Sequence, residues 1–176
     1  MTTPTPITPA QYRIIAGFGG FLILIGAALS IFGVIFLKSA LASYTWPSTP
    51  GLVQAVTSNL YYSESNGSIK TYSYTVAYQY EVAEISYTGD RYSLGAGPTA
   101  SQQQYDSHAE AQRAGKAAYP PGSEVTVYYD PKTPTAAVLQ PGANWGTYVP
   151  LMLGAVFLPS GVLFFKVLAR AQQAAG

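Results

Sequence analysis

Residues 14–37 read IIAGFGGFLILIGAALSIFGVIFL, an unbroken run of 24 uncharged residues between Arg13 and Lys38. As a helix this run would be about 36 Å long, enough to cross a hydrocarbon core of roughly 30 Å with some tilt. A cleaved signal peptide is the alternative, but its apolar region has only about 7–15 residues. We therefore expect a retained transmembrane helix.

A second uncharged stretch, residues 145–165, ends immediately before Lys166. Its 21 residues would span about 31 Å as a helix. Trp145 and Tyr148 lie at its start, where amphipathic rings suit the membrane interface. The two stretches predict five parts: a tail (1–13), a first transmembrane helix (14–37), a central domain (38–144), a second transmembrane helix (145–165) and another tail (166–176).

The charges separate into two groups. All eight acidic residues but only five of the nine basic ones lie in residues 39–144, which gives this segment a net charge of −3. The other four, Arg13, Lys38, Lys166 and Arg170, are all basic and border the apolar stretches. Basic residues near the termini favour cytoplasmic ends, and long loops translocate largely regardless of charge. We expect both termini in the cytoplasm and the central domain on the outer side of the membrane.

Glycines recur seven residues apart in both apolar stretches, at Gly26 and Gly33 and at Gly154 and Gly161. Seven residues are nearly two helical turns, so each pair lies on one face, where small residues let helices approach closely. Two interpretations stay open: the two helices pack against each other, or the faces receive another subunit. Neither stretch contains an ionisable residue, which argues against an ion or proton pathway.

The central domain has the pattern of a small β-rich fold. Residues 69–82 alternate, with Tyr and Val at every second position, which is typical of a half-buried strand. Ser107 and Glu110 form a capping box at the start of a short helix. The predicted order is strand 52–62, a turn at Asn66-Gly67, strands 69–82 and 85–92, helix 107–118, and strands 124–129 and 135–139. The fold class is thus two transmembrane helices flanking a small, mainly antiparallel α+β domain.

The end of this domain carries a motif. It consists of YPPG at residues 119–122, VTVYYDP at 125–131, and then Pro134 and the residues AVL at 137–139. This motif resembles the closing motif of a bacterial family catalogued as domain of unknown function 3592. The layout is also similar to that family, with a helix, a β-rich domain containing a Tyr-x-Tyr strand and a Tyr-x-Gly turn, and a second helix. The matching residues, within a resemblance that covers residues 14–165, are Tyr72, Tyr74, Tyr87 and Gly89.

That resemblance implies a bacterial inner or cytoplasmic membrane, with the domain periplasmic or extracellular, and it brings no known activity. Thr133 stands where the family pattern leads us to expect Asn, which affects only the turn. Asp130 can bond the backbone that follows it, and the prolines restrict the turn before an edge strand.

Enzyme chemistry finds little support in the composition. There is no cysteine for a disulfide or thiolate site, and the single histidine, His108, has no partner at a catalytic spacing. Glu81 and Glu84 would lie on opposite faces of a strand. The glycine-rich run at residues 95–100 contains Pro98 and lacks a following helix, so we expect no dinucleotide site, no other cofactor and no metal. A net charge of +1 argues against nucleic acid.

The number of tyrosines is unusual, and 13 of the 15 lie in the central domain. We expect most of them in the core. Neighbouring tyrosines on a strand must point to opposite faces, so some face outward. The candidate contact surface comprises Tyr61, Tyr62, Tyr128 and Tyr129.

We expect a non-enzymatic accessory or scaffold protein in the lipid bilayer, in contact with a membrane-protein partner or as a homo-oligomer. Two alternatives stay open. One is a module that binds envelope glycan through exposed tyrosines, and the other is an enzyme with an unrecognised site around Glu81, Asp106 or His108.

Overall fold

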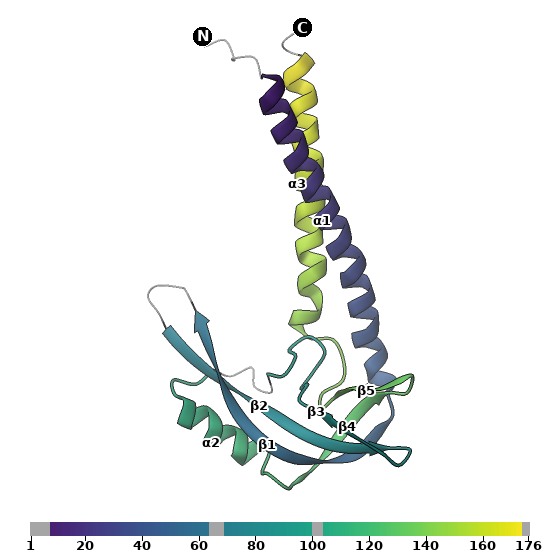
Figure 1. Cartoon of the computed structure of the whole chain (residues 1–176), viewed down its shortest axis with the longest axis vertical. Helices are drawn as coiled ribbons and strands as arrows, with labels where there is room; N and C mark the ends of the chain where they lie inside the picture. The colour runs from purple at the N-terminus through teal and green to yellow at the C-terminus, as the bar shows by residue number, and fades with distance from the viewer. Residues whose placement is uncertain (1–7, 64–68, 100–103, 174–176) are drawn as a thin grey trace. The chain divides into compact units, whose positions relative to one another are not determined.

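The computed structural model describes residues 8–63, 69–99 and 104–173, with side chains outside the description at 61–63, 69–70 and 171–173. The chain divides into two compact units (Figure 1). One is a helical hairpin, from the segments Met1–Phe36 and Tyr148–Gly176, and the other is a β domain, Leu37–Thr147.

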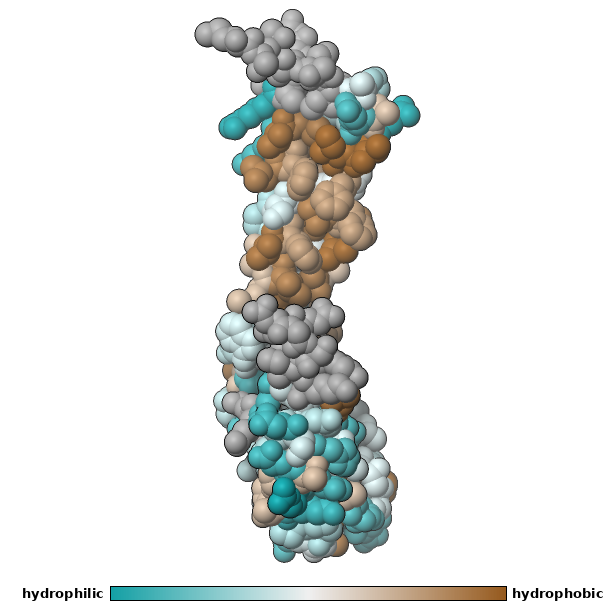
Figure 2. Space-filling view, turned by 90° about the vertical axis from the view of Figure 1, so that its left-hand side faces the viewer, coloured by the Kyte–Doolittle hydropathy of each residue, from teal (hydrophilic) through white to brown (hydrophobic). Residues whose placement is uncertain are grey.

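The helical hairpin is formed by α1 (Pro9–Ala42) and α3 (Trp145–Gln173). Their most apolar windows have mean hydropathies of 2.6 and 2.0, and only 11% and 17% of those windows is buried. Apolar side chains therefore cover the outside of the hairpin (Figure 2). By length and composition both helices can cross a bilayer, which confirms the predicted pair of long apolar helices on either side of the domain.

The β domain contains a five-stranded antiparallel sheet in the order β3-β2-β1-β4-β5 (Figure 1). This confirms the predicted antiparallel domain with one short helix. Its elements are η1 (Ser43–Thr45), β1 (Ser48–Ser63), β2 (Ile69–Val82), β3 (Ile85–Gly89), α2 (His108–Ala118), β4 (Glu124–Asp130) and β5 (Thr133–Val138).

A β-bulge in β1 sets the composition of the core. Val53 pairs with Tyr78 and Ala55 with Ala77, so Gln54 is an extra residue without an opposite partner. Val53 and Val56, three positions apart, would face opposite sides of a regular strand. The extra residue places both in the core, where they are 2% and 4% exposed.

Helix α2 covers the part of the sheet around Val56, Val76 and Tyr74. The Ser107 hydroxyl accepts a hydrogen bond from the Glu110 amide at 3.2 Å, which is the N-cap expected from the sequence. Ala111 and Gly115 form the buried side of the helix. A Cβ atom at Gly115 would lie 2.6 Å from a methyl group of Val56, so only glycine allows this close packing.

The sheet curls until its edge strands β3 and β5 lie against one another. The Tyr92 carbonyl, just after β3, accepts hydrogen bonds from the amides of Leu139 and Gln140, just after β5, at 3.1 and 2.7 Å. The result is a partly open five-stranded barrel around a second core of Tyr78, Tyr80, Val127 and Ala137.

The β4–β5 turn follows the sequence expectation in one respect and departs from it in another. Asp130 accepts a hydrogen bond from the Lys132 amide at 2.9 Å, as an Asx turn requires. Pro134, expected as a turn residue, lies inside β5 instead. An edge strand tolerates proline there because one of its sides has no ladder to complete.

Candidate functional site

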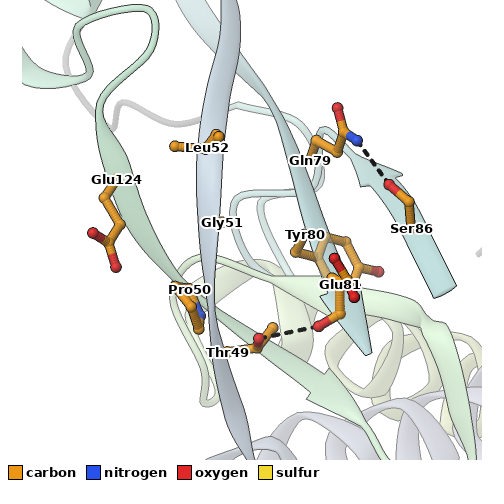
Figure 3. Close-up of a pocket in the computed structure, with 9 residues that line it drawn as sticks. All are labelled: Thr49, Pro50, Gly51, Leu52, Gln79, Tyr80, Glu81, Ser86 and Glu124. Carbon is orange, nitrogen blue, oxygen red and sulfur yellow. Dashed lines mark hydrogen bonds between the residues drawn. The ribbon is translucent and has the colours of Figure 1, made fainter. Parts of the chain in front are cut away.

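The outer face of the sheet, which points away from the core, carries a hollow of about 470 Å³ (Figure 3). Leu52 lies at its centre on β1, paired with Gln79 of β2 on one side and Glu124 of β4 on the other. The Leu52 side chain is 52% exposed. The remaining lining residues are Thr49, Pro50, Gly51, Tyr80, Glu81 and Ser86.

A second hollow of about 340 Å³ lies farther along the same strands. Its lining includes Gln54, Thr88 and Asp90. The Gln54 amide donates to the Gln79 side chain at 3.2 Å, and Gln79 donates to the Ser86 hydroxyl at 2.7 Å. This polar ladder joins the two hollows across β1, β2 and β3, and we call the combined surface the outer groove.

The chemistry of the outer groove is that of hydrogen bonding without positive charge. Its charged side chains are the carboxylates of Glu81, Glu124 and Asp90, and its lining residues include neither lysine nor arginine. Exposed Leu52 and Pro50 add a small apolar surface. Such a surface suits a ligand rich in hydroxyl groups, whereas phosphate groups would meet only like charge.

The residues considered for enzyme chemistry do not assemble at this groove. Glu81 lines it, whereas Asp106 and His108 are not among the lining residues. Glu84 lies in the β2–β3 turn, and the rings of His108 and Tyr72 lie in an edge-type arrangement with centroids 6.3 Å apart. Within the described ranges, no group of three His, Asp or Glu side chains could hold a metal ion.

The core tyrosines hold the curled sheet together. The Tyr78 hydroxyl is shared between the carbonyls of Arg91 at 2.9 Å and Ala137 at 3.2 Å, and Tyr80 donates to Pro134 at 2.6 Å. Burial is the largest cause that raises the pKa of Tyr78 and of Tyr80 above the ordinary value of 10.0. Both rings therefore remain neutral phenols that join β2 to β5 and to the segment after β3.

The Tyr-x-Gly segment, Tyr87 to Gly89, lies in β3 and not in a turn. It pairs with Tyr78 and Tyr80 of β2, whereas Tyr72 and Tyr74 lie farther along β2. Tyr87 lies opposite Tyr80, and their rings stack with centroids 5.7 Å apart. Gly89 lies opposite Tyr78.

The four candidate contact tyrosines fall into two pairs. Tyr128 and Tyr129 on β4 are both half-buried, and Tyr129 packs on the core cluster of Tyr78 and Val127. The backbones of Tyr61 and Tyr62 belong to β1, and their side chains lie outside the described residues.

The four repeated glycines all lie where α1 and α3 pack together. Added Cβ atoms would lie 2.6 Å from Leu158 at Gly26 and 2.7 Å from Leu151 at Gly33. At Gly154 and Gly161 the nearest atoms, at 2.3 and 2.6 Å, belong to Ser30 and Ile23. These contacts correspond to the interpretation in which the two helices of one chain pack against each other.

The base of the β domain has a polar cluster that sequence reasoning missed. The Gly142 amide donates to the buried Ser43 hydroxyl at 2.7 Å, and Ser43 donates to the Ala40 carbonyl at 2.7 Å. Beside them, the side-chain amide of Asn144 donates a hydrogen bond to the Ser93 hydroxyl at 2.6 Å. These bonds join the segments that follow α1 and precede α3. Gly95, Gly142 and Gly146 lie in this cluster, and at each of them an added Cβ atom would clash with a neighbouring residue.

The sequence model of one protein family, described as a domain of unknown function (DUF3592), matches residues 49–144. The chain belongs to this family. The DUF3592 match begins at the start of β1 and ends in the polar cluster at the base, so it coincides with the β domain rather than with the apolar helices. No curated protein matches the chain.

All five strands lie within the matched segment, apart from Ser48 at the start of β1. Gly51 also lies in the matched segment and allows close packing in the sheet, since a Cβ atom there would lie 2.7 Å from Val127 and 2.9 Å from the Gln79 carbonyl. In this member the outer groove lies within the matched segment, on β1, β2, β3 and β4.

Proposed function

We propose that this DUF3592 protein is a non-enzymatic accessory or scaffold protein of a membrane assembly, whose β domain makes protein contacts. The observation that carries the proposal is a free edge of β1. β2 pairs with β1 from Gly51 to Ser63, whereas β4 pairs only with Ser48 to Leu52. Beyond Val53, which bonds residues 122 and 123, no described residue pairs with the β4 side of this strand.

The chemistry of this edge favours a partner strand. Residues 54–60, QAVTSNL, contain no charge and no proline, and Leu60 is 41% exposed. Natural sheets usually protect such edges with charged residues, prolines or a covering element, because unpaired backbone groups are a template for another strand. An extended segment of a membrane-protein partner, or of a second copy, could add to the sheet here.

We further propose that the protein resides in a bacterial inner or cytoplasmic membrane with both termini in the cytoplasm. The support is the distribution of basic residues, with Arg13, Lys166 and Arg170 near the ends of the chain. Because the chain has no cysteine, a single cysteine at exposed Thr126 can be tested with a membrane-impermeant maleimide in intact cells. Labelling only after lysis would contradict this orientation.

The protein contact is tested by placing charge on the β1 edge. Thr57→Lys combined with Leu60→Lys should abolish copurification of the partner, or dissociate the oligomer, in native mass spectra recorded in mild detergent. Thr126→Lys, on β4 opposite Pro50, is the matched control and should leave the assembly intact. A chain that is monomeric and without a copurifying protein under every mild condition would refute the proposal.

A further inference from the structure

We propose that the outer groove binds an uncharged linear oligosaccharide. The groove is a separate surface from the free edge of β1, so this inference goes beyond the protein contact proposed above. Its two hollows, of about 470 and 340 Å³, lie on one face and are joined by the Gln54–Gln79–Ser86 ladder. An occupant of both must be extended and longer than a single sugar ring.

The side chains of the groove offer what sugar hydroxyls need. Amide and carboxylate groups present adjacent hydrogen-bonding atoms, as in the side chains of Gln79 and Glu124, on either side of Leu52 (Figure 3). Ser86 and Thr88 add hydroxyl groups that both donate and accept. The side chains of Gln79, Ser86, Thr88 and Glu124 are all exposed, so a ligand can reach them without opening the fold.

The apolar part of the groove has a matching partner in the same ligand. Leu52 and Pro50 form a small apolar strip on β1 between the polar groups of β2 and β4. A pyranose with equatorial hydroxyl groups has an apolar C–H face and a polar rim, so its face fits Leu52 while its rim meets Gln79 and Glu124. Burial of the exposed leucine surface would add a hydrophobic contribution to the hydrogen bonds.

Other occupants fit the same residues less well. Nucleic acid and phosphorylated ligands require basic side chains, and the groove lining contains three carboxylates and no lysine or arginine. An acyl chain requires a continuous apolar surface, whereas polar residues surround Leu52 and Pro50. Barrels of the OB type, which are likewise five-stranded and partly open, bind oligosaccharides or oligonucleotides on the face of their second and third strands. That analogy of architecture agrees with the position of the groove, and the charge selects the oligosaccharide.

The test uses the full chain in nanodiscs free of glycolipid, because detergents with sugar headgroups would compete for the groove. The probe is a hexamer of β-1,4-linked N-acetylglucosamine, titrated by calorimetry. We expect saturable binding that weakens about tenfold or more in Gln79→Ala and in Leu52→Ser, since each removes one class of contact. Thr57→Ala, on the same strand but outside the groove, should bind as the unaltered chain does, and unchanged thermal unfolding of each variant shows that the fold is intact.

A variant with fewer charges distinguishes binding of the sugar from binding of a cationic ligand. Glu81→Gln combined with Glu124→Gln keeps hydrogen-bonding atoms in place and removes two charges, so hexamer binding should persist within a few-fold. An oligolysine that binds the unaltered chain more tightly than the hexamer, and is lost in this variant, would overturn the proposal. So would absence of hexamer binding at millimolar concentration, or binding that Gln79→Ala and Leu52→Ser leave unchanged.

Discussion

Gly89 lies opposite Tyr78 in the β2–β3 ladder, and the Tyr78 ring occupies the space into which a side chain at position 89 would project. An added Cβ atom would lie 2.8 Å from two ring carbons and 2.9 Å from the hydroxyl oxygen. The Tyr-x-Gly pattern is thus one half of a packing arrangement, whose other half is a fully buried tyrosine on the neighbouring strand.

Gly89→Ala is expected to lower the free energy of unfolding by about 1–3 kcal/mol, because the Tyr78 ring must move and weaken its hydrogen bonds. Thermal or denaturant unfolding of the protein, followed by near-ultraviolet circular dichroism, measures the effect. Ser86→Ala, at an exposed position of the same strand, is the control and should change stability little. Equal stability of the two variants would show that the Tyr78 ring does not require the glycine.

Alkaline pH should unfold the β domain. Burial raises the pKa of Tyr74, Tyr78, Tyr80 and Tyr119 above 10.0 in the folded protein. Above pH 10.0 the unfolded chain therefore binds fewer protons than the folded one, so the free energy of unfolding falls as pH rises. Below that pH these groups are protonated in both the folded and the unfolded state, so their ionisation does not make the free energy of unfolding depend on pH.

Titration of phenolate absorbance together with circular dichroism measures this effect. The buried tyrosines should ionise late and together with loss of structure, because burial raises their pKa in the folded protein. Tyr78→Phe removes one late-ionising group, so the late absorbance change should shrink. Ionisation of every tyrosine near pH 10 with the fold intact would contradict the prediction.

The β2–β3 turn offers a stabilising change. Ala83 and Glu84 have φ values of 51° and 65°, which Asn and Gly adopt more readily than other residues. The double substitution Ala83→Asn and Glu84→Gly should raise the free energy of unfolding by about 1–2 kcal/mol, because it relieves two left-handed residues. Both positions are exposed, so the melting temperature should report the backbone alone. An unchanged or lower melting temperature would argue against strain at this turn.

The helical hairpin provides a matched pair of glycine substitutions. Gly26→Ala and Gly33→Ala should separate α1 from α3, because each Cβ atom would lie within 3 Å of α3 backbone atoms. Gly17→Ala and Gly20→Ala are the controls, since nothing lies within 4 Å of their added Cβ atoms. Pulse proteolysis in detergent should show faster cleavage of the first pair and no change or slower cleavage of the second. The reverse order would refute the packing of the hairpin.

The periodic parts of this fold were predictable from the sequence. Alternation at residues 69–82 reflects one buried face, and β2 occupies that range. Ser107 and Glu110 gave the start of α2, because an N-cap is a local interaction. The uncharged run at residues 14–37 predicted the first long helix, and α1 contains this run and continues for several residues at both ends.

The candidate site was less accessible to sequence reasoning. The outer groove depends on a bulge at Gln54 and on the register that sets Leu52 between Gln79 and Glu124, and neither is encoded by a local pattern. The tyrosine count predicted a core rich in tyrosine, and Tyr74, Tyr78 and Tyr80 are less than a tenth exposed, but the count did not indicate which tyrosines would remain at the surface. Composition indicated the residue type, whereas tertiary pairing decided which of those residues remain accessible.

The hydrogen bond between Ser43 and Gly142 connects positions 99 residues apart, next to the points where the chain passes from one helix into the domain and back into the other. Under mechanical load this bond would hold the first and last segments of the domain together. A force that draws the two helices apart would load this bond, and the neighbouring Asn144–Ser93 contact, before it reached any strand of the sheet.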